Sequence, residues 1–87
     1  MPGLGLSRRV GEAVLIGPHR VEVAATDAGV ALLVVTGQDA MRSWRRPGEP
    51  PLRVGEAFVL VQSVGLRSVR LSIVAPRHVA IAREEIA

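Results

Sequence analysis

The feature that most constrains this sequence is its density of branched apolar residues in short runs that stop at glycine or proline. Its 87 residues include fourteen valines and four isoleucines. Such side chains fit the pleated, half-buried surface of a β-strand. Turn-forming residues separate the runs, as in tight meanders. The sequence therefore predicts an all-β protein, with strands at residues 4–10, 13–16, 20–25, 30–35, 57–62, 69–74 and 79–83.

Residues 37–53 differ in character from the rest of the chain. They hold the only tryptophan, Trp44, and three prolines, of which Pro50 and Pro51 are adjacent. Adjacent prolines cannot donate hydrogen bonds to a β-ladder, so any strand here should be short and at a sheet edge. An ordered linker is the alternative. At the other end of the chain, residues 84–86 are compatible with a single helical turn.

Length and composition exclude several classes of protein. A domain of this size buries only about 60% of its unfolded surface, which favours self-association. There is no cysteine, and His19 and His78 lie far apart, so neither a disulfide framework nor a metal site is expected. Both histidines are expected to be surface turn residues. No apolar run approaches the roughly 20 residues of a membrane span, and the first five residues lack an export pattern. We therefore expect a cytoplasmic protein without membrane association.

The charge pattern is compatible with nucleic-acid binding. All eleven basic residues are arginine, and the net charge is +3. Arginine grips phosphate or a base edge with two parallel hydrogen bonds, although a GC-rich genome produces the same composition. A charge of +3 is too small for coating a duplex, so any binding to nucleic acid should be local.

The sequence lacks the residue patterns of an enzyme. No nucleophile with a base, phosphate-cradling glycine loop or metal-ligand spacing is visible. Glu84 and Glu85 are adjacent, and adjacent side chains point apart, which does not suit acid–base catalysis. We expect a protein that is not an enzyme and needs no cofactor.

The chain contains a weak internal repeat. Residues 6–12 (LSRRVGE) have a counterpart in residues 43–49 (SWRRPGE), 37 positions later. A rival offset of 44 pairs residues 9–13 with the identical pentapeptide at residues 53–57 (RVGEA). With the first offset a strand, a hairpin and a strand follow both copies at similar distances, whereas the rival offset puts its second copy in a different strand–turn context.

Both ends of the chain carry motifs of a known family. Residues 6–17 (LSRRVGEAVLIG) and residues 69–86 (VRLSIVAPRHVAIAREEI) closely resemble the carbon storage regulator family, CsrA/RsmA. The chain is longer than one family unit. Counted back from Ala75-Pro76 without a gap, residues 45–49 (RRPGE) fall where the family has its own R-R-V-G-E, and this resemblance favours the offset of 37. It looks like two units in tandem: residues 4–36 would supply strands one to four of the first, residues 37–53 a degenerate linker or edge strand, and residues 54–87 the remainder of the second with its fifth strand.

The resemblance implies a fold and an assembly. Family members are intertwined homodimers, in which the first and fifth strands of one subunit complete a sheet of the other. Two fused units would form the same CsrA-like β-sandwich as a single-chain pseudo-dimer, which we expect to be monomeric. A homodimer in which residues 37–53 are an insertion is the alternative.

The resemblance also implies a function. The family binds GGA-containing hairpin loops in mRNA leaders and controls translation or mRNA stability. This chain is therefore expected to be a bacterial RNA-binding regulator whose partners are such mRNAs, with small regulatory RNAs as further candidates. Contact with the flagellar assembly protein FliW is not expected, because the terminal helix is short here. The alternative is a protein-interaction module that has lost RNA binding.

Family positions transfer onto two segments and one corner of this chain. One complete RNA site is expected, and the second site should be defective because its fifth strand is missing. The expected RNA-binding residues are Leu6, Ser7, Arg8 and Arg9 on the first strand, Ala75, Pro76 and Arg77 at the corner, and Val79, Ala80, Ile81, Ala82 and Arg83 on the fifth strand.

Single positions within this set carry sharper expectations. Strand alternation sends Arg8 and Arg9 to opposite faces; Arg8 is expected to contact RNA and Arg9 to brace the turn at Glu12. Arg83 is expected to contact RNA, with an ion pair to a neighbouring glutamate as the alternative. Trp44 is expected to cover the core rather than stack on a base.

Overall fold

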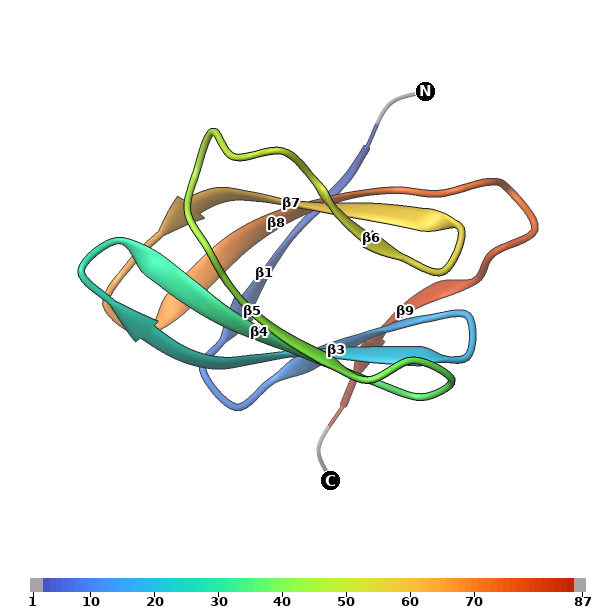
Figure 1. Ribbon diagram of the computed structural model, residues 1–87, viewed down its shortest axis with the longest axis horizontal. Helices are drawn as coiled ribbons and strands as arrows, with labels where there is room; N and C mark the ends of the chain where they lie inside the picture. Colours follow the sequence, from blue (N-terminus) through green and yellow to red (C-terminus); the bar gives the residue numbers. More distant parts are fainter. Residues whose placement is uncertain (1–2, 86–87) are drawn as a thin grey trace.

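The computed structural model describes residues 3–85 and consists of two antiparallel sheets packed face to face (Figure 1). This confirms the all-β class. The nine strands are β1 (Leu4–Arg9), β2 (Ala13–Ile16), β3 (His19–Asp27), β4 (Val30–Thr36), β5 (Met41–Arg45), β6 (Leu52–Val54), β7 (Ala57–Val64), β8 (Ser68–Val74) and β9 (Ile81–Glu84).

Each sheet combines strands from both halves of the chain. The four-stranded sheet has the order β1-β8-β7-β6, and the five-stranded sheet has the order β5-β4-β3-β2-β9. The first strand thus pairs with β8, and the last strand pairs with β2. Two edges of different sheets, β1 and β9, are built from opposite ends of the sequence.

The core fills the space between the sheets with side chains from alternate strand positions. Val21 and Val23 of β3 face Val59 and Leu71 of the other sheet within one buried cluster. Complete burial of an aliphatic side chain of this size contributes about 1.5–3 kcal/mol. The branched residues that predicted the strands are therefore also those that hold the sandwich together.

Structural features of the first half recur in the second half 37 or 38 residues later. β3 and β7 each carry a bulge, between Val23 and Ala25 and between Val61 and Ser63, 38 residues apart. In the turns after β1 and β5 the offset is 37. There the N–H of Arg9 donates to Glu12 Oε1 at 2.7 Å, and the N–H of Arg46 donates to Glu49 Oε1 at the same distance. The rival offset of 44 instead places its second copy in the β6–β7 hairpin.

Three sequence-based expectations fail in detail. Trp44 lies outside the core cluster and is 51% exposed on β5, because it points away from the opposite sheet. His19 is buried in β3 rather than on a surface turn. Glu84 ends a strand and Glu85 is not helical, so no helical turn forms there. Ile86, the last residue of the expected turn, lies outside the described residues.

Candidate nucleic-acid interface

β1 and β9 are edge strands of different sheets, and the side chain of Arg8 connects them. Its Nη1 donates to the carbonyl oxygen of Ala13 at 3.2 Å and to that of Glu84 at 3.4 Å. Glu84 is 76 residues further along the chain and belongs to the other sheet. Arg8, one of the expected first-strand residues, thus contacts the end of the last strand.

The free edge of β1 exposes the backbone of alternate residues. The N–H of Val10 donates to the carbonyl of Arg67 at 2.9 Å, and this register continues along β8. In an antiparallel ladder every second residue bonds to the neighbouring strand and the residues between them face the other way. Gly5 and Ser7 therefore present backbone polar groups at this edge.

The free edge of β9 is built in the same way. The N–H of Gly17 donates to the carbonyl of Ala80 at 2.8 Å, and Leu15 is opposite Ala82. The alternation leaves Ile81 and Arg83 facing outward. Unpaired donors and acceptors of this kind can read the pairing edges of single-stranded bases.

Arg8 and Arg9 point in directions opposite to those expected from the sequence. Arg8 is only 6% exposed, and it lies on the same inward side of β1 as the buried Leu6. The Arg9 side chain is exposed, while its backbone N–H bonds to Glu12. The physical reason is that Leu6 and Arg8 share the face of β1 that turns toward the core. Arg8 and Leu6 therefore position this edge, and Ser7 and Arg9 are accessible.

Arg83 is exposed and forms no ion pair within residues 3–85. Its neighbour Glu84 bonds instead to Arg20, whose Nε lies 2.8 and 2.9 Å from the two carboxylate oxygens. These bonds lower the pKa of Glu84 and raise the pKa of Arg20 above its ordinary value. Arg83 thus keeps its guanidinium available.

The corner between β8 and β9 carries the remaining expected residues. The N–H of Val79 donates to the carbonyl of Pro76 at 3.0 Å, which closes a turn with Arg77 exposed within it. Ala75, Val79 and Ile81 pack against the core. Ala80 and Ala82 are exposed, and Pro76 is partly buried.

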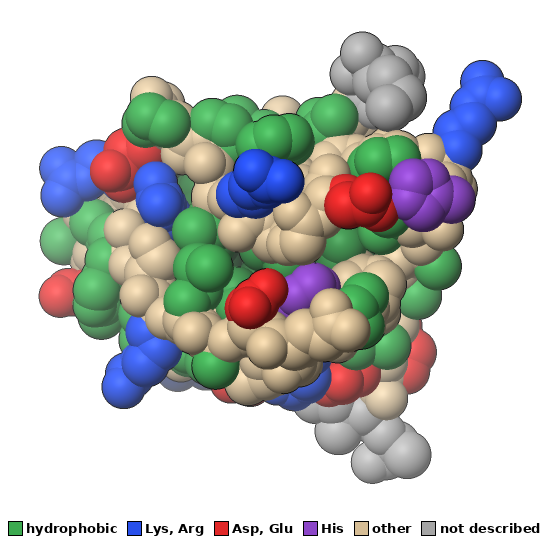
Figure 2. Space-filling view, turned by 45° about the vertical axis from the view of Figure 1, so that its right-hand side comes forward, with side chains coloured by type: hydrophobic (Ala, Val, Ile, Leu, Met, Phe, Trp, Pro, Cys, Tyr) green, Lys and Arg blue, Asp and Glu red, His purple; other side chains and the backbone are tan. Residues whose placement is uncertain are grey.

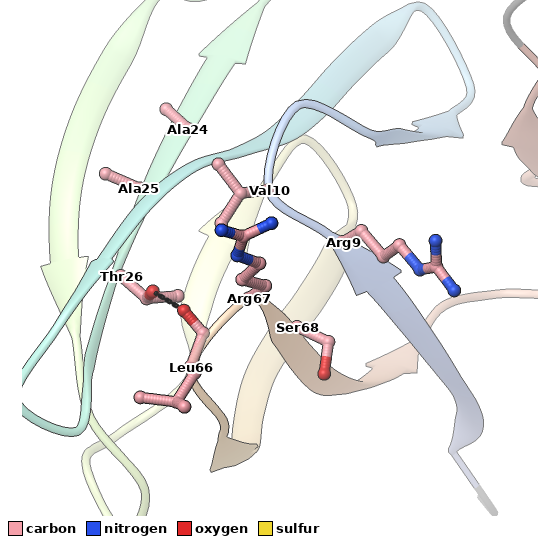
Figure 3. A pocket seen from close by; sticks show the side chains of 8 residues that line it. All are labelled: Arg9, Val10, Ala24, Ala25, Thr26, Leu66, Arg67 and Ser68. Atoms are coloured by element: carbon pink, nitrogen blue, oxygen red, sulfur yellow. Dashed lines mark hydrogen bonds between the residues drawn. The ribbon is translucent and has the colours of Figure 1, made fainter.

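Two residues beside this site, Arg70 and Arg67, were not predicted from the sequence. Arg70 is opposite Ser7, and its Nη2 would lie only 2.8 Å from a Cβ added to Gly5. Arg67 lines a pocket of about 790 Å³ together with Arg9, and no carboxylate is among the lining residues (Figure 3). The available signal was the alternation of β8, which places Arg70 on the exposed face.

The comparisons do not identify the chain. No family model, no curated protein and no solved structure matches it. Within residues 3–85, no group of three or more histidine or acidic side chains could hold a metal ion. No helix in this described part is long and apolar enough to cross a membrane.

Proposed function

We propose that this chain is a sequence-specific RNA-binding regulator that holds GGA-containing hairpin loops at the free edges of β1 and β9. The proposal includes a CsrA-like sandwich formed by one chain as a monomeric pseudo-dimer. The observation that carries it is the contact of Arg8 with the Glu84 carbonyl, which joins the two motif-bearing strands across the sheets. Bound at an mRNA leader in the cytoplasm, the protein would act by occlusion, which needs no catalytic group.

Each part of the site has a distinct role in this proposal. Gly5, Ser7, Ile81 and Arg83 offer edge backbone groups to unpaired bases. The side chains of Arg9 and Arg83 contact phosphate or stack on a base. Arg8 and Leu6 act only by positioning the edge.

The test is a titration with a GGA-loop hairpin and a GGA-to-CCA control, followed by light scattering of the complex. One hairpin per 9.2 kDa chain with loop-dependent affinity would support the proposal. One hairpin per two chains would indicate the homodimer. Equal affinity for both loops would contradict sequence-specific binding.

A protein-interaction module is the second candidate function. The burial of Leu6 and Arg8 favours it, because two motif side chains are used inside the fold rather than at its surface. Under this alternative the motif would persist for structural reasons alone. A well-folded chain with no GGA-dependent binding would be the expected result.

A further inference from the structure

One edge of the four-stranded sheet lacks the strand that its counterpart has. β2 and β6 occupy equivalent places in the two halves, since Ile16 and His19 close the β2–β3 hairpin as Val54 and Ala57 close the β6–β7 hairpin. β2 is covered by β9, whereas β6 ends its sheet. Exposed edges of this kind are templates for pairing with another chain.

The hydrogen-bonding groups at β6 can be assigned from β2. Gly17 and Leu15 face β9, so their counterparts 38 residues later, Gly55 and Arg53, face away from β7. The N–H of Gly55 has no backbone partner within residues 3–85. The next outward position is Pro51, which has no N–H. The edge therefore offers two donors, and an added strand would be short.

The side chains beside β6 are apolar where those beside β2 are charged. Beside β2, Arg20 of β3 donates a hydrogen bond to Glu84 of the covering strand β9, and it also donates to Glu22. Their counterparts on β7 are Phe58 and Leu60, and Phe58 is 42% exposed. A strand added at β6 would thus meet an aromatic ring where β9 meets an arginine.

The end of this edge opens into a pocket of about 470 Å³. Val54, Gly55 and Glu56 line it together with His78 and Val79 of the β8–β9 connection. Both histidines lie on one face of the molecule, each near an acidic side chain (Figure 2). The pocket can take the side chain of a residue entering beside Gly55.

We infer that β6 is a docking edge for an extended, mostly apolar segment of another polypeptide. The segment adds as an antiparallel fifth strand, bonds to the backbone of Arg53 and Gly55, and lays an apolar side chain against Phe58. The docking segment has the extended conformation of residues 75–85 of this chain, and it carries an apolar residue at the position of Glu84. The site lies on an edge distinct from that proposed for RNA, so the two can be tested separately.

The experiment uses the full chain and two synthetic peptides with the sequence of residues 75–85, one native and one carrying Glu84→Leu. We expect saturable one-to-one binding, roughly fivefold tighter for the Glu84→Leu peptide, because it buries apolar area on Phe58. Hydrogen exchange should show new protection of the Arg53 and Gly55 amides, with Leu15 and Gly17 unchanged. No saturable binding, or equal affinity for both peptides, would overturn the inference.

Two variants and one control peptide define the site. Arg53→Pro removes an outward N–H without touching the β7 ladder and should abolish peptide binding while leaving hairpin RNA binding intact. Arg9→Ala, on the other edge of the sheet, should leave peptide binding unchanged. A peptide with Ile81→Asp should not bind. A chain that dimerises alone with Arg53 and Gly55 protected would show that a second copy fills the edge, which contradicts docking of a different partner.

Discussion

Arg8 of β1 donates a hydrogen bond to the carbonyl oxygen of Glu84 of β9, and this bond links the two sheets at the proposed RNA-binding edge. Arg8 also donates to the carbonyl of Ala13, which anchors the start of β2, and to the carbonyl of its neighbour Ser7. A buried guanidinium with backbone partners holds both strands in a fixed relation. The arginine pair of the motif therefore divides into a positioning residue, Arg8, and an accessible residue, Arg9.

Replacing Arg8 by alanine should destabilise the protein more than replacing Arg9. Hydrogen bonds to a charged group contribute about 1.5–3 kcal/mol each, and Arg8 is buried whereas Arg9 is exposed. We expect Arg8→Ala to lower the free energy of unfolding by about 2 kcal/mol and Arg9→Ala to change it by less than about 0.5 kcal/mol. Urea denaturation of the two variants measures this, and equal losses would contradict the assigned roles.

Replacing Arg83 by alanine should separate RNA binding from folding. Arg83 is exposed and has no ion pair within residues 3–85, so we expect no change in thermal unfolding. Affinity for the GGA hairpin should fall about tenfold or more, as for loss of a charge-assisted contact. Arg77→Ala is the matched control on the neighbouring corner, with a smaller loss expected. Unchanged hairpin affinity in Arg83→Ala would contradict the proposed site.

Much of the fold could be predicted from the sequence, since the runs of valine and isoleucine lie within or overlap the observed strands. β6 was missed because Leu52–Val54 is only three residues long and follows two prolines. β5 was recognised only as a degenerate edge. Short edge strands depend on their neighbours for stability, and a local pattern does not contain that information.

The site was harder to predict than the fold. Motif position suggested Arg8 as the exposed arginine, but the inward face of β1 follows from its pairing with β8, which is a long-range contact. Arg70 lies near Gly5, and Arg67 lines a pocket with Arg9. Both were missed because these positions also depend on the pairing of β1 with β8. The hydrogen bond from Arg8 to the carbonyl of Glu84 likewise joins residues 76 positions apart, which no local pattern in the sequence indicates.

Acid should weaken the attachment of β9 to β2. Hydrogen bonds from Arg20 lower the pKa of Glu84, so the ionised form is favoured in the folded state. This stability is present above the ordinary pKa of a glutamate and is lost as the pH falls through the lowered folded value. We expect the difference in unfolding free energy between the native chain and Glu84→Gln to shrink toward zero below that value. A difference independent of pH would contradict the role of this ion pair.

Substitution of Gly55 should reveal the close packing of His19 beneath the open edge. Gly55 has φ +59°, and an added Cβ would lie 2.8 Å from Cε1 of the buried His19 ring. At Gly48, with φ +87°, a Cβ would meet nothing within 4 Å. Both alanine variants bear the backbone strain of about 1–2 kcal/mol, but only Gly55→Ala adds a steric clash, with a further cost of about 1–3 kcal/mol.

A double-mutant cycle isolates that clash. His19→Ala places at this position the residue type of its counterpart Ala57. In this background the steric part of the loss in unfolding free energy caused by Gly55→Ala should disappear, and only the backbone strain should remain. The coupling energy from thermal or urea unfolding then reports the contact between the ring and the added methyl group. Additive effects of the two substitutions would mean that the His19 ring does not pack against Gly55 in solution.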